Sequence, residues 1–183
     1  RNRKRAEIWA LKSFRDRSTI RMEDTEMDKL VLYRPRLEEL SWREKWLGDS
    51  PTMSYNHAFG GTIAFPRERW TDWYARWMED DTGTHFYRYL QMEDGGEFVG
   101  NVSYHYDEEF QGHICEVLVA ARYRGRGFGR QGLALLCAAA RANGVKRLMD
   151  NIALDNPSVE LFRRMGFQER LRTEEYVLME KEL

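Results

Sequence analysis

The sequence predicts a single α/β (α+β) domain in which helices flank a mixed central sheet of six to seven strands. A chain of 183 residues is long enough to bury one hydrophobic core. The spacing of apolar residues changes from helical to alternating near residue 85, and helices alternate with strands toward the end. Strands joined through a helix pair in parallel, whereas strands joined by tight turns pair antiparallel, so we expect a mixed sheet.

Residues 1–28 are predicted to be an N-terminal extension, helical or mobile, ahead of a domain at residues 29–183. The extension opens on a basic cluster, and Ile8 and Leu11 have the spacing of a short helix. We interpret it as a solvated segment, with a nucleic-acid-binding arm as the alternative. The first residue is not Met, so we expect a trimmed or processed chain.

The first strand is predicted at residues 30–33, where an apolar run closes before Pro35. Residues 37–47 follow with the spacing of an amphipathic helix, which Gly48 ends. One face of this helix is predicted to carry Leu37, Leu40, Glu44 and Leu47.

Residues 49–65 are rich in turn-forming residues and are predicted to be a long loop, a type that is usually functional or mobile. Pro66 suits the first turn of another helix, which carries Trp70, Trp73 and Trp77.

The second half of the chain is predicted to supply most of the sheet. Residues 85–92 and 98–106 alternate as strands do, and Asp94-Gly95-Gly96 between them is typical of a tight hairpin. A second turn leads to a third strand at 114–119. The remaining elements are a helix at 129–143, a strand at 148–154, a helix at 157–165 and a strand at 176–179.

The charge balance excludes one class of function. The 29 basic and 30 acidic residues give a formal net charge of −1. Sequence-blind binding of nucleic acid needs a positive excess, so we expect no nucleic-acid partner. No stretch reaches the ~20 apolar residues that span a bilayer, and no signal-peptide pattern opens the sequence. We therefore expect no membrane partner and a cytoplasmic location.

The cysteines and histidines predict no metal site. Cys115 and Cys137 lack the C-x-x-C spacing of a metal or redox pair and are expected to be core residues. The four histidines show no i, i+4 pair of the kind that binds zinc.

The most informative stretch is a buried strand, Val117-Leu118-Val119, that leads into alternating glycines at the start of a helix. Each such glycine weakens regular structure by ~0.5–1 kcal/mol, which suggests that the backbone closely approaches a ligand. The first amides of a helix lack intrahelical partners, and the helix dipole favours an anion there. Four arginines, which can fork onto phosphate oxygens, add positive charge: Arg122, Arg124, Arg126 and Arg130. The turn therefore predicts a pyrophosphate site.

Other interpretations of this turn fit less well. A P-loop needs Lys-Ser or Lys-Thr after its glycines, and none follows. A dinucleotide fingerprint needs G-x-G-x-x-G in a parallel unit, but Gly125, Gly127 and Gly129 alternate after antiparallel strands. An RNA-recognition motif matches residues 126–129 only and would have to lie within a strand. A plain tight turn would not explain the four arginines.

Two blocks of the sequence match motifs of a known family. Arg122-Tyr123-Arg124-Gly125-Arg126-Gly127 fits the signature R/Q-x-x-G-x-G/A. Residues 155–158 with 161–167 are similar to the segment N-x-x-A-x-x-L-Y-x-x-x-G-F. Over about residues 30–180 the chain therefore resembles the GNAT family of N-acetyltransferases. Residues 49–55 are similar to the ribosomal-protein and aminoglycoside branches.

This resemblance implies a sheet that splays between its fourth and fifth strands and binds acetyl-CoA as co-substrate. The backbone of residues 117–119 would pair with the pantetheine arm, and amides from Arg124 to Arg130 would hold the pyrophosphate. Asn156 would contact the pantetheine or hold the strands apart, a role compatible with capping a helix. The implied coenzyme-binding set is Val117, Leu118, Val119, Arg122, Arg124, Gly125, Arg126, Gly127, Phe128, Gly129, Arg130, Asn156 and Phe162.

Glu116 is the candidate general base, because an acid inside an apolar strand must be paired or line a cleft. Pairing with a neighbouring arginine is the alternative interpretation. The resemblance supports the base, since many relatives have a carboxylate at this strand position that acts through water. His105 is the weaker candidate, followed by Tyr104.

The general acid is unassigned, because Phe162 stands where the family usually has a tyrosine that protonates the leaving thiolate. Solvent, Tyr123, Tyr104 or Ser158 remain as proton sources. The alternative is a domain that binds acyl-CoA without rapid turnover.

The resemblance predicts transfer of an acetyl group to a primary amine of a small molecule, a peptide N-terminus or a lysine, by direct attack in a ternary complex. An acyl-CoA sensor or interaction module and an RNA-binding domain are the alternatives. The amine is expected to lie between loop 49–65 and the tryptophan helix. Asp107, Glu108 and Glu109 either attract a cation there or form a solvated hairpin tip. The oligomeric state is not predicted, and a homodimer is one of the alternatives.

Overall fold

A computed structural model describes residues 28–80 and 82–183, so all but the last residue of the extension predicted at 1–28 lies outside the described chain. A seven-stranded mixed sheet in the order β1-β2-β3-β4-β5-β7-β6 forms its centre. The strands are β1 Leu30–Tyr33, β2 His85–Met92, β3 Phe98–Asp107, β4 Gly112–Val119, β5 Arg147–Ala153, β6 Gln168–Arg172 and β7 Tyr176–Glu182. The predicted fold class is confirmed.

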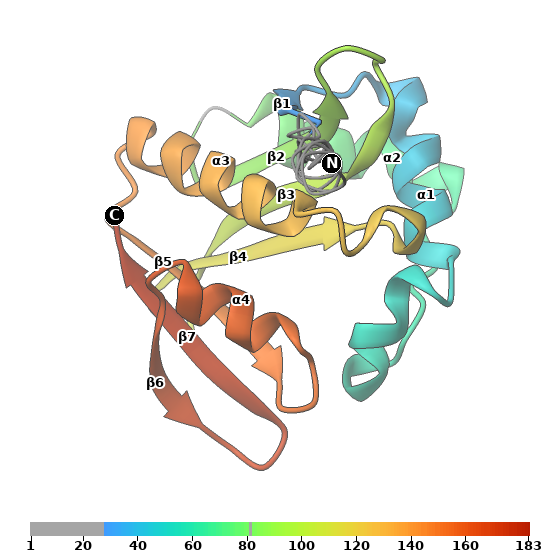
Figure 1. The fold of residues 1–183 in the computed structure, drawn as a ribbon. Coiled ribbons are helices and arrows are strands. Elements are labelled where there is room, and N and C mark those ends of the chain that lie inside the picture. Colours follow the sequence, from blue (N-terminus) through green and yellow to red (C-terminus); the bar gives the residue numbers. More distant parts are fainter. Residues whose placement is uncertain (1–27, 81) are drawn as a thin grey trace, which may run out of the picture.

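Helices cover both faces of this sheet. The α-helices are α1 Leu40–Gly48, α2 Trp70–Tyr74, α3 Phe128–Ala142 and α4 Ser158–Arg164. In Figure 1, α3 and α4 cross the near face. A Cβ added at Gly132 of α3 would lie 2.8 Å from Leu90 of β2, so this helix packs directly on the strands. On the opposite face, Trp73 of α2 meets Tyr87 of β2 with ring centroids 4.8 Å apart.

The sheet opens between β4 and β5. Their parallel pairing covers His113 with Leu148 and Ile114 with Met149 only. Beyond these pairs β4 stays bonded to β3 as far as Val119, while β5 stays bonded to β7 as far as Ala153. Because each strand follows its other neighbour, the two diverge toward their carboxyl ends, as the family resemblance implied (Figure 1).

Three predictions for the first half need correction. The predicted loop 49–65 contains a 3-10 helix, Thr52–Phe59. Asp49 nucleates it, because its carboxylate accepts the Thr52 amide at 3.0 Å and the Thr52 hydroxyl at 2.5 Å. Leu37 is 38% exposed in a separate 3-10 turn, whereas Leu40 and Leu47 are buried as predicted. Pro66 likewise precedes a 3-10 turn, Arg67–Arg69, rather than standing in the first turn of α2.

The last two predicted strands were expected to run parallel, and this was wrong. β5 and β7 are antiparallel, because the chain passes through β6 and a turn before it returns as β7. Every residue of β6 is exposed and most are charged, so the strand has no apolar alternation that the sequence could reveal.

Candidate active site

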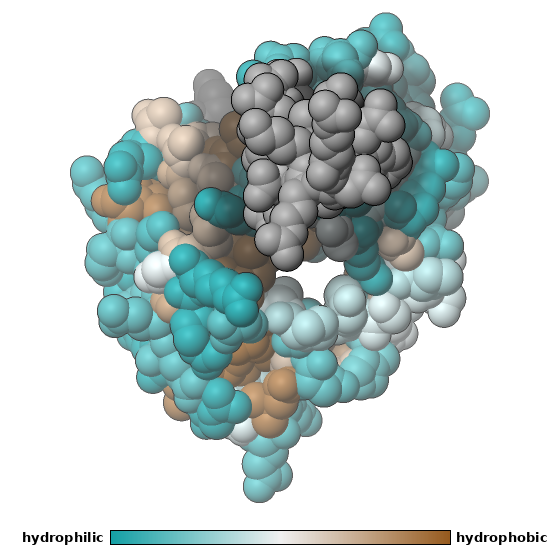
Figure 2. Space-filling model, in the orientation of Figure 1, coloured by the Kyte–Doolittle hydropathy of each residue, from teal (hydrophilic) through white to brown (hydrophobic). Residues whose placement is uncertain are grey.

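A cleft of about 700 Å³ lies where β4 and β5 diverge. Residues 114–119 of β4 and 150–153 of β5 form two of its walls. The start of α4, the 3-10 helix at residues 52–59 and the turn before α3 complete it. Figure 2 shows an opening near the centre of the displayed face, in the region where Figure 1 places the ends of these elements.

The edge of β4 presents backbone groups to this cleft. The Ala120 amide donates to Val99 of the preceding strand at 2.9 Å, and a Cβ at Gly100 would lie 1.9 Å from the Leu118 carbonyl oxygen. Backbone groups alternate in direction along a strand, so those of Val117 and Val119 face the gap. The Leu118 carbonyl faces β3, although the residue also lines the cleft.

The glycine turn, residues 124–130, follows this edge directly. Gly125 and Gly127 have φ of +76° and +80°, a conformation that glycine adopts without strain. Gly127 immediately precedes α3, and its carbonyl accepts the Gln131 amide at 3.1 Å. The amides of Phe128, Gly129 and Arg130 therefore belong to the first turn of α3, where they have no intrahelical acceptor.

Three of the four arginines in this region contact the protein itself. Arg122 pairs with Glu97 at 3.0 Å, and Arg126 pairs with Asp28 at 2.5 Å. Arg124 donates to the carbonyls of Val119 at 3.2 Å and Pro51 at 2.9 Å, and it lies over the Tyr55 ring. Arg124 thus links the glycine turn to the 3-10 helix across the cleft, while Arg130 lines the cleft.

Glu116 projects into the cleft from β4, and its side chain is exposed there. Its Oε1 accepts a hydrogen bond of 2.6 Å from the fully buried Asn101 amide. Within the described residues no arginine lies within 4.0 Å of this carboxylate, which disfavours the alternative of a simple ion pair.

Asp150 of β5 lines the same cleft from the opposite strand, and the sequence analysis missed it. Burial raises the pKa of the Asp150 carboxyl well above its ordinary value, and the charge of Glu116 raises it further. Asp150 therefore keeps its proton to a higher pH than an ordinary aspartate. The signal that singled out Glu116, an acid inside an apolar strand, is present here too, in Leu148-Met149-Asp150.

The other proposed catalytic residues divide between the cleft and its surroundings. His105 lines the cleft beside Trp77, and burial lowers its pKa, so the ring is neutral at pH 7. Ser158 also lines the cleft. Tyr104 lies on the other face of the sheet, where its hydroxyl accepts the Asn143 amide at 2.9 Å.

Tyr123 lines the cleft, but its hydroxyl donates to Glu97. Burial and this hydrogen bond both raise the pKa of Tyr123. Phe162 is 2% exposed and packs edge-on against Phe167 with ring centroids 4.8 Å apart. Asn156 accepts the Ser158 amide at 2.9 Å, so it caps α4 while it lines the cleft.

The three acidic residues Asp107, Glu108 and Glu109 do not line this cleft. Asp107 accepts the amides of Glu109 and Phe110 at 2.9 and 3.0 Å, which fixes the turn between β3 and β4. The trio therefore forms a hairpin tip, the second of the two interpretations that the sequence left open.

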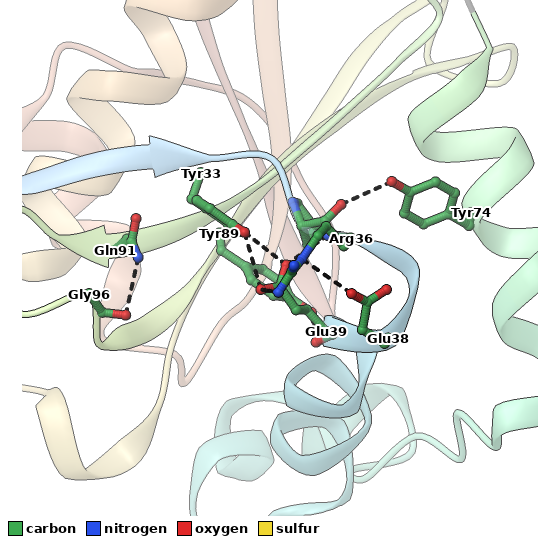
Figure 3. A network of polar contacts seen from close by, with 9 residues as sticks. Tyr33, Arg36, Glu38, Glu39, Tyr74, Tyr89, Gln91 and Gly96 are labelled. Carbon is green, nitrogen blue, oxygen red and sulfur yellow. Dashed lines mark hydrogen bonds and ion pairs between the residues drawn. The ribbon is translucent and has the colours of Figure 1, made fainter.

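A polar network fixes the start of α1, the helix that carries Arg43 at the edge of the cleft (Figure 3). Glu39 accepts the Tyr33 hydroxyl at 3.0 Å and the Arg36 amide at 2.8 Å. Tyr89 of β2 donates to the Glu39 carbonyl at 2.8 Å, and Tyr74 of α2 donates to Pro35 at 3.1 Å. The Tyr89 contact ties the start of α1 to β2, and the Tyr74 contact ties α2 to the segment before α1. Together they help to set the position of Arg43 at the cleft.

Residues 39–167 match the sequence profile of the Acetyltransferase (GNAT) family, so the chain belongs to this family. No curated protein matches the sequence significantly.

Solved structures of acetyltransferases share the fold. A ribosomal-protein-alanine N-acetyltransferase from Brucella melitensis is 25% identical, with a TM-score of 0.67 over 84% of this chain and 100% of that chain. Spermidine N-acetyltransferase from Vibrio cholerae, solved with CoA and spermine, is 16% identical, with a TM-score of 0.67 over 84% and 95% of the two chains. A Salmonella typhimurium protein solved with its cofactor acetyl-CoA is 16% identical, with a TM-score of 0.64 over 85% and 94%.

No described helix is both long and apolar enough to cross a membrane. Residues 28–80 and 82–183 contain no group of three or more His, Cys, Asp or Glu side chains placed to hold a metal ion.

Proposed function

We propose that the chain transfers an acetyl group from acetyl-CoA to a primary amine by direct attack within a ternary complex. One observation carries the proposal: an unpaired strand edge, the amides of the glycine turn and a carboxylate converge on a single cleft. The family and the coenzymes bound by the solved relatives support it.

The cleft fits the coenzyme. Nothing lies within 4 Å of a Cβ built at Gly125, so a phosphate has room beside that backbone. Amides of residues 128–130 would receive the pyrophosphate, and the backbone of Val117 and Val119 would pair with the pantetheine arm. Acetyl-CoA, once bound there, supplies an activated thioester.

Glu116 would accept the proton that the amine must lose. Removing a proton from an amine of pKa ~10.4 at pH 7 costs about 4.6 kcal/mol, so a positioned base matters most for basic amines. Asn101 holds the carboxylate through a hydrogen bond of 2.6 Å and thereby fixes its direction.

Asp150 joins Ser158 and solvent as a proton source for the leaving thiolate. Phe162 has no acidic proton, and the Tyr123 hydroxyl is already bonded to Glu97. Asp150 faces the same cleft and keeps its proton to a raised pH. The alternative function, an acyl-CoA sensor with weak turnover, is favoured by Phe162 alone.

The test is release of free thiol from acetyl-CoA with a panel of amines: alanine-terminated peptides, spermidine, lysine and simple amino acids. Amine-dependent release is expected. Calorimetric binding of acetyl-CoA without release from any amine would support the sensor, and absence of binding would refute both functions.

A further inference from the structure

Arg43 of α1 lines the cleft and packs against three aromatic rings, of which Tyr87 also lines the cleft while Trp73 and Phe65 lie behind it. Its guanidinium carbon is 4.8 Å from the Trp73 ring centroid, 5.1 Å from that of Tyr87 and 5.2 Å from that of Phe65. These rings are the kind of surface that binds a cationic substrate. Here the protein's own arginine already occupies it.

The hydrogen bonds of this guanidinium are incomplete within the described residues. Nη1 donates to the Tyr87 hydroxyl at 3.2 Å, while the buried Nε has no partner. No carboxylate among the described residues lies within 4.0 Å of Arg43. A guanidinium has five donors, and leaving a buried one unpaired is unfavourable.

Arg43 nevertheless stays charged. Burial disfavours the cation, but the Tyr87 hydroxyl and the Glu116 carboxylate outweigh it, so the pKa of Arg43 lies above its ordinary value. The acceptor side of the cleft therefore presents a fixed positive group, Arg43, and a negative one, Glu116. This arrangement complements a molecule that carries a carboxylate beside its amine.

We propose that Arg43 binds a carboxylate of the acceptor, so that the substrates are small amino acids rather than polyamines. The proposal rests on the acetyltransferase function and narrows its acceptor. The amine lies toward Glu116 and the carboxylate toward the Nη end of Arg43, since Nη2 has no acceptor among the described residues and, unlike Nε, is not buried without a partner. A polyamine, in contrast, would be repelled by the like charge of Arg43 in the cleft.

The test compares matched acceptors that differ only in the carboxylate: glycine with glycinamide, and β-alanine with β-alaninamide. Rates are expressed per concentration of neutral amine, because the amides are less basic. With saturating acetyl-CoA, kcat/KM is expected to favour the carboxylate about 10- to 100-fold, the range of a charged hydrogen bond.

Arg43→Met is expected to remove this preference while the amides react within about threefold of wild-type rates. Arg76→Met is the matched control, since Arg76 is exposed on the neighbouring turn, and it should keep the preference. Equal rates for acid and amide in the wild type, or an equal loss for both in Arg43→Met, would overturn the proposal.

Equilibrium binding of the same pairs to the CoA-bound protein separates this proposal from the enzymatic one. Carboxylate-selective binding that disappears in Arg43→Met supports the carboxylate site at Arg43, even if no thiol is released. Absence of thiol release would refute only the proposed acetyl transfer. Turnover of amines without a preference for carboxylate-bearing acceptors would refute only the carboxylate site at Arg43. Thermal melting of Arg43→Met confirms that the variant is folded.

Discussion

The two sides of the cleft are built from different materials. The side proposed to bind the coenzyme consists of backbone from one continuous stretch, residues 117–130, whose conformation depends on glycines at φ of +76° and +80°. The side proposed to bind the acceptor consists of side chains from separate elements, with Arg43 on α1, Trp77 just after α2 and Tyr87 on β2. A backbone site constrains the local sequence strongly, whereas a side-chain site depends on how distant elements pack.

The largest effect that this comparison predicts belongs to Glu116, which lies between the two sides. Glu116→Gln should lower kcat by about 10²- to 10⁴-fold, because the amide keeps an acceptor for Asn101 but cannot take up a proton. The loss should be larger for a strongly basic amine than for a weakly basic one. CoA affinity, measured by calorimetry, should not change. Glu109→Gln on the β3–β4 turn is the control, and a loss of CoA affinity in Glu116→Gln would contradict the division between the two sides.

Asp150 predicts a smaller effect, on stability. The folded protein holds the Asp150 proton to a higher pH than the unfolded chain, whose aspartate has a pKa of about 3.9. The group's contribution to stability is therefore present below pH ~4 and is lost as the pH rises through the raised folded pKa. Asp150→Asn has no carboxyl to ionise and avoids this loss, so its melting temperature should lie above that of the wild type. The shift should be about 2–4 °C for each kcal/mol of unfolding free energy gained.

Thermal melts of Asp150→Asn between pH 4 and 8 check this expectation, with Asp94→Asn in the exposed β2–β3 turn as the control. The difference from the wild type should widen as the pH rises. A difference that does not vary with pH would show that Asp150 titrates as an ordinary surface carboxylate.

The smallest predicted effect concerns Asp28, which pairs with Arg126 beside the glycine turn. Both side chains are partly exposed, so this pair is weak. Asp28→Asn should free the arginine and tighten CoA binding about twofold, with a steeper dependence on salt. Glu169→Gln breaks a similar exposed pair with Arg172 on β6 and should leave CoA affinity unchanged. Weaker binding in Asp28→Asn would mean that Asp28 supports the site.

The sequence predicted the local structure of residues 117–130 well, because the signals for it are local. The strand ending at Val119, the glycine turn and the helix that follows it all lie where their spacing indicates. The two expected strands β1 and β2 also match, since alternation and turn residues mark their limits. Glu116 could be singled out because an acid is rare inside an apolar strand.

The rest could not be predicted, because it depends on tertiary contacts. Arg43 looks like an ordinary exposed residue of an amphipathic helix until α2 and β2 place rings around it. β6 has no apolar pattern, since all its residues are exposed. Because β6 could not be predicted, β7 was wrongly expected to run parallel to β5. The partners of Arg124 lie about 70 residues away in the sequence, in the 3-10 helix segment.

The central claim is that the backbone of the glycine turn grips the diphosphate of the coenzyme, and two matched glycines test it directly. Gly125 and Gly144 have φ of +76° and +82°, and neither has a heavy atom within 4 Å of an added Cβ. Valine at either position therefore introduces a similar backbone strain, but only Gly125 lines the cleft. Calorimetry should show that Gly125→Val weakens CoA binding at least tenfold while Gly144→Val leaves it unchanged. Equal CoA affinities for the two variants would contradict the claim.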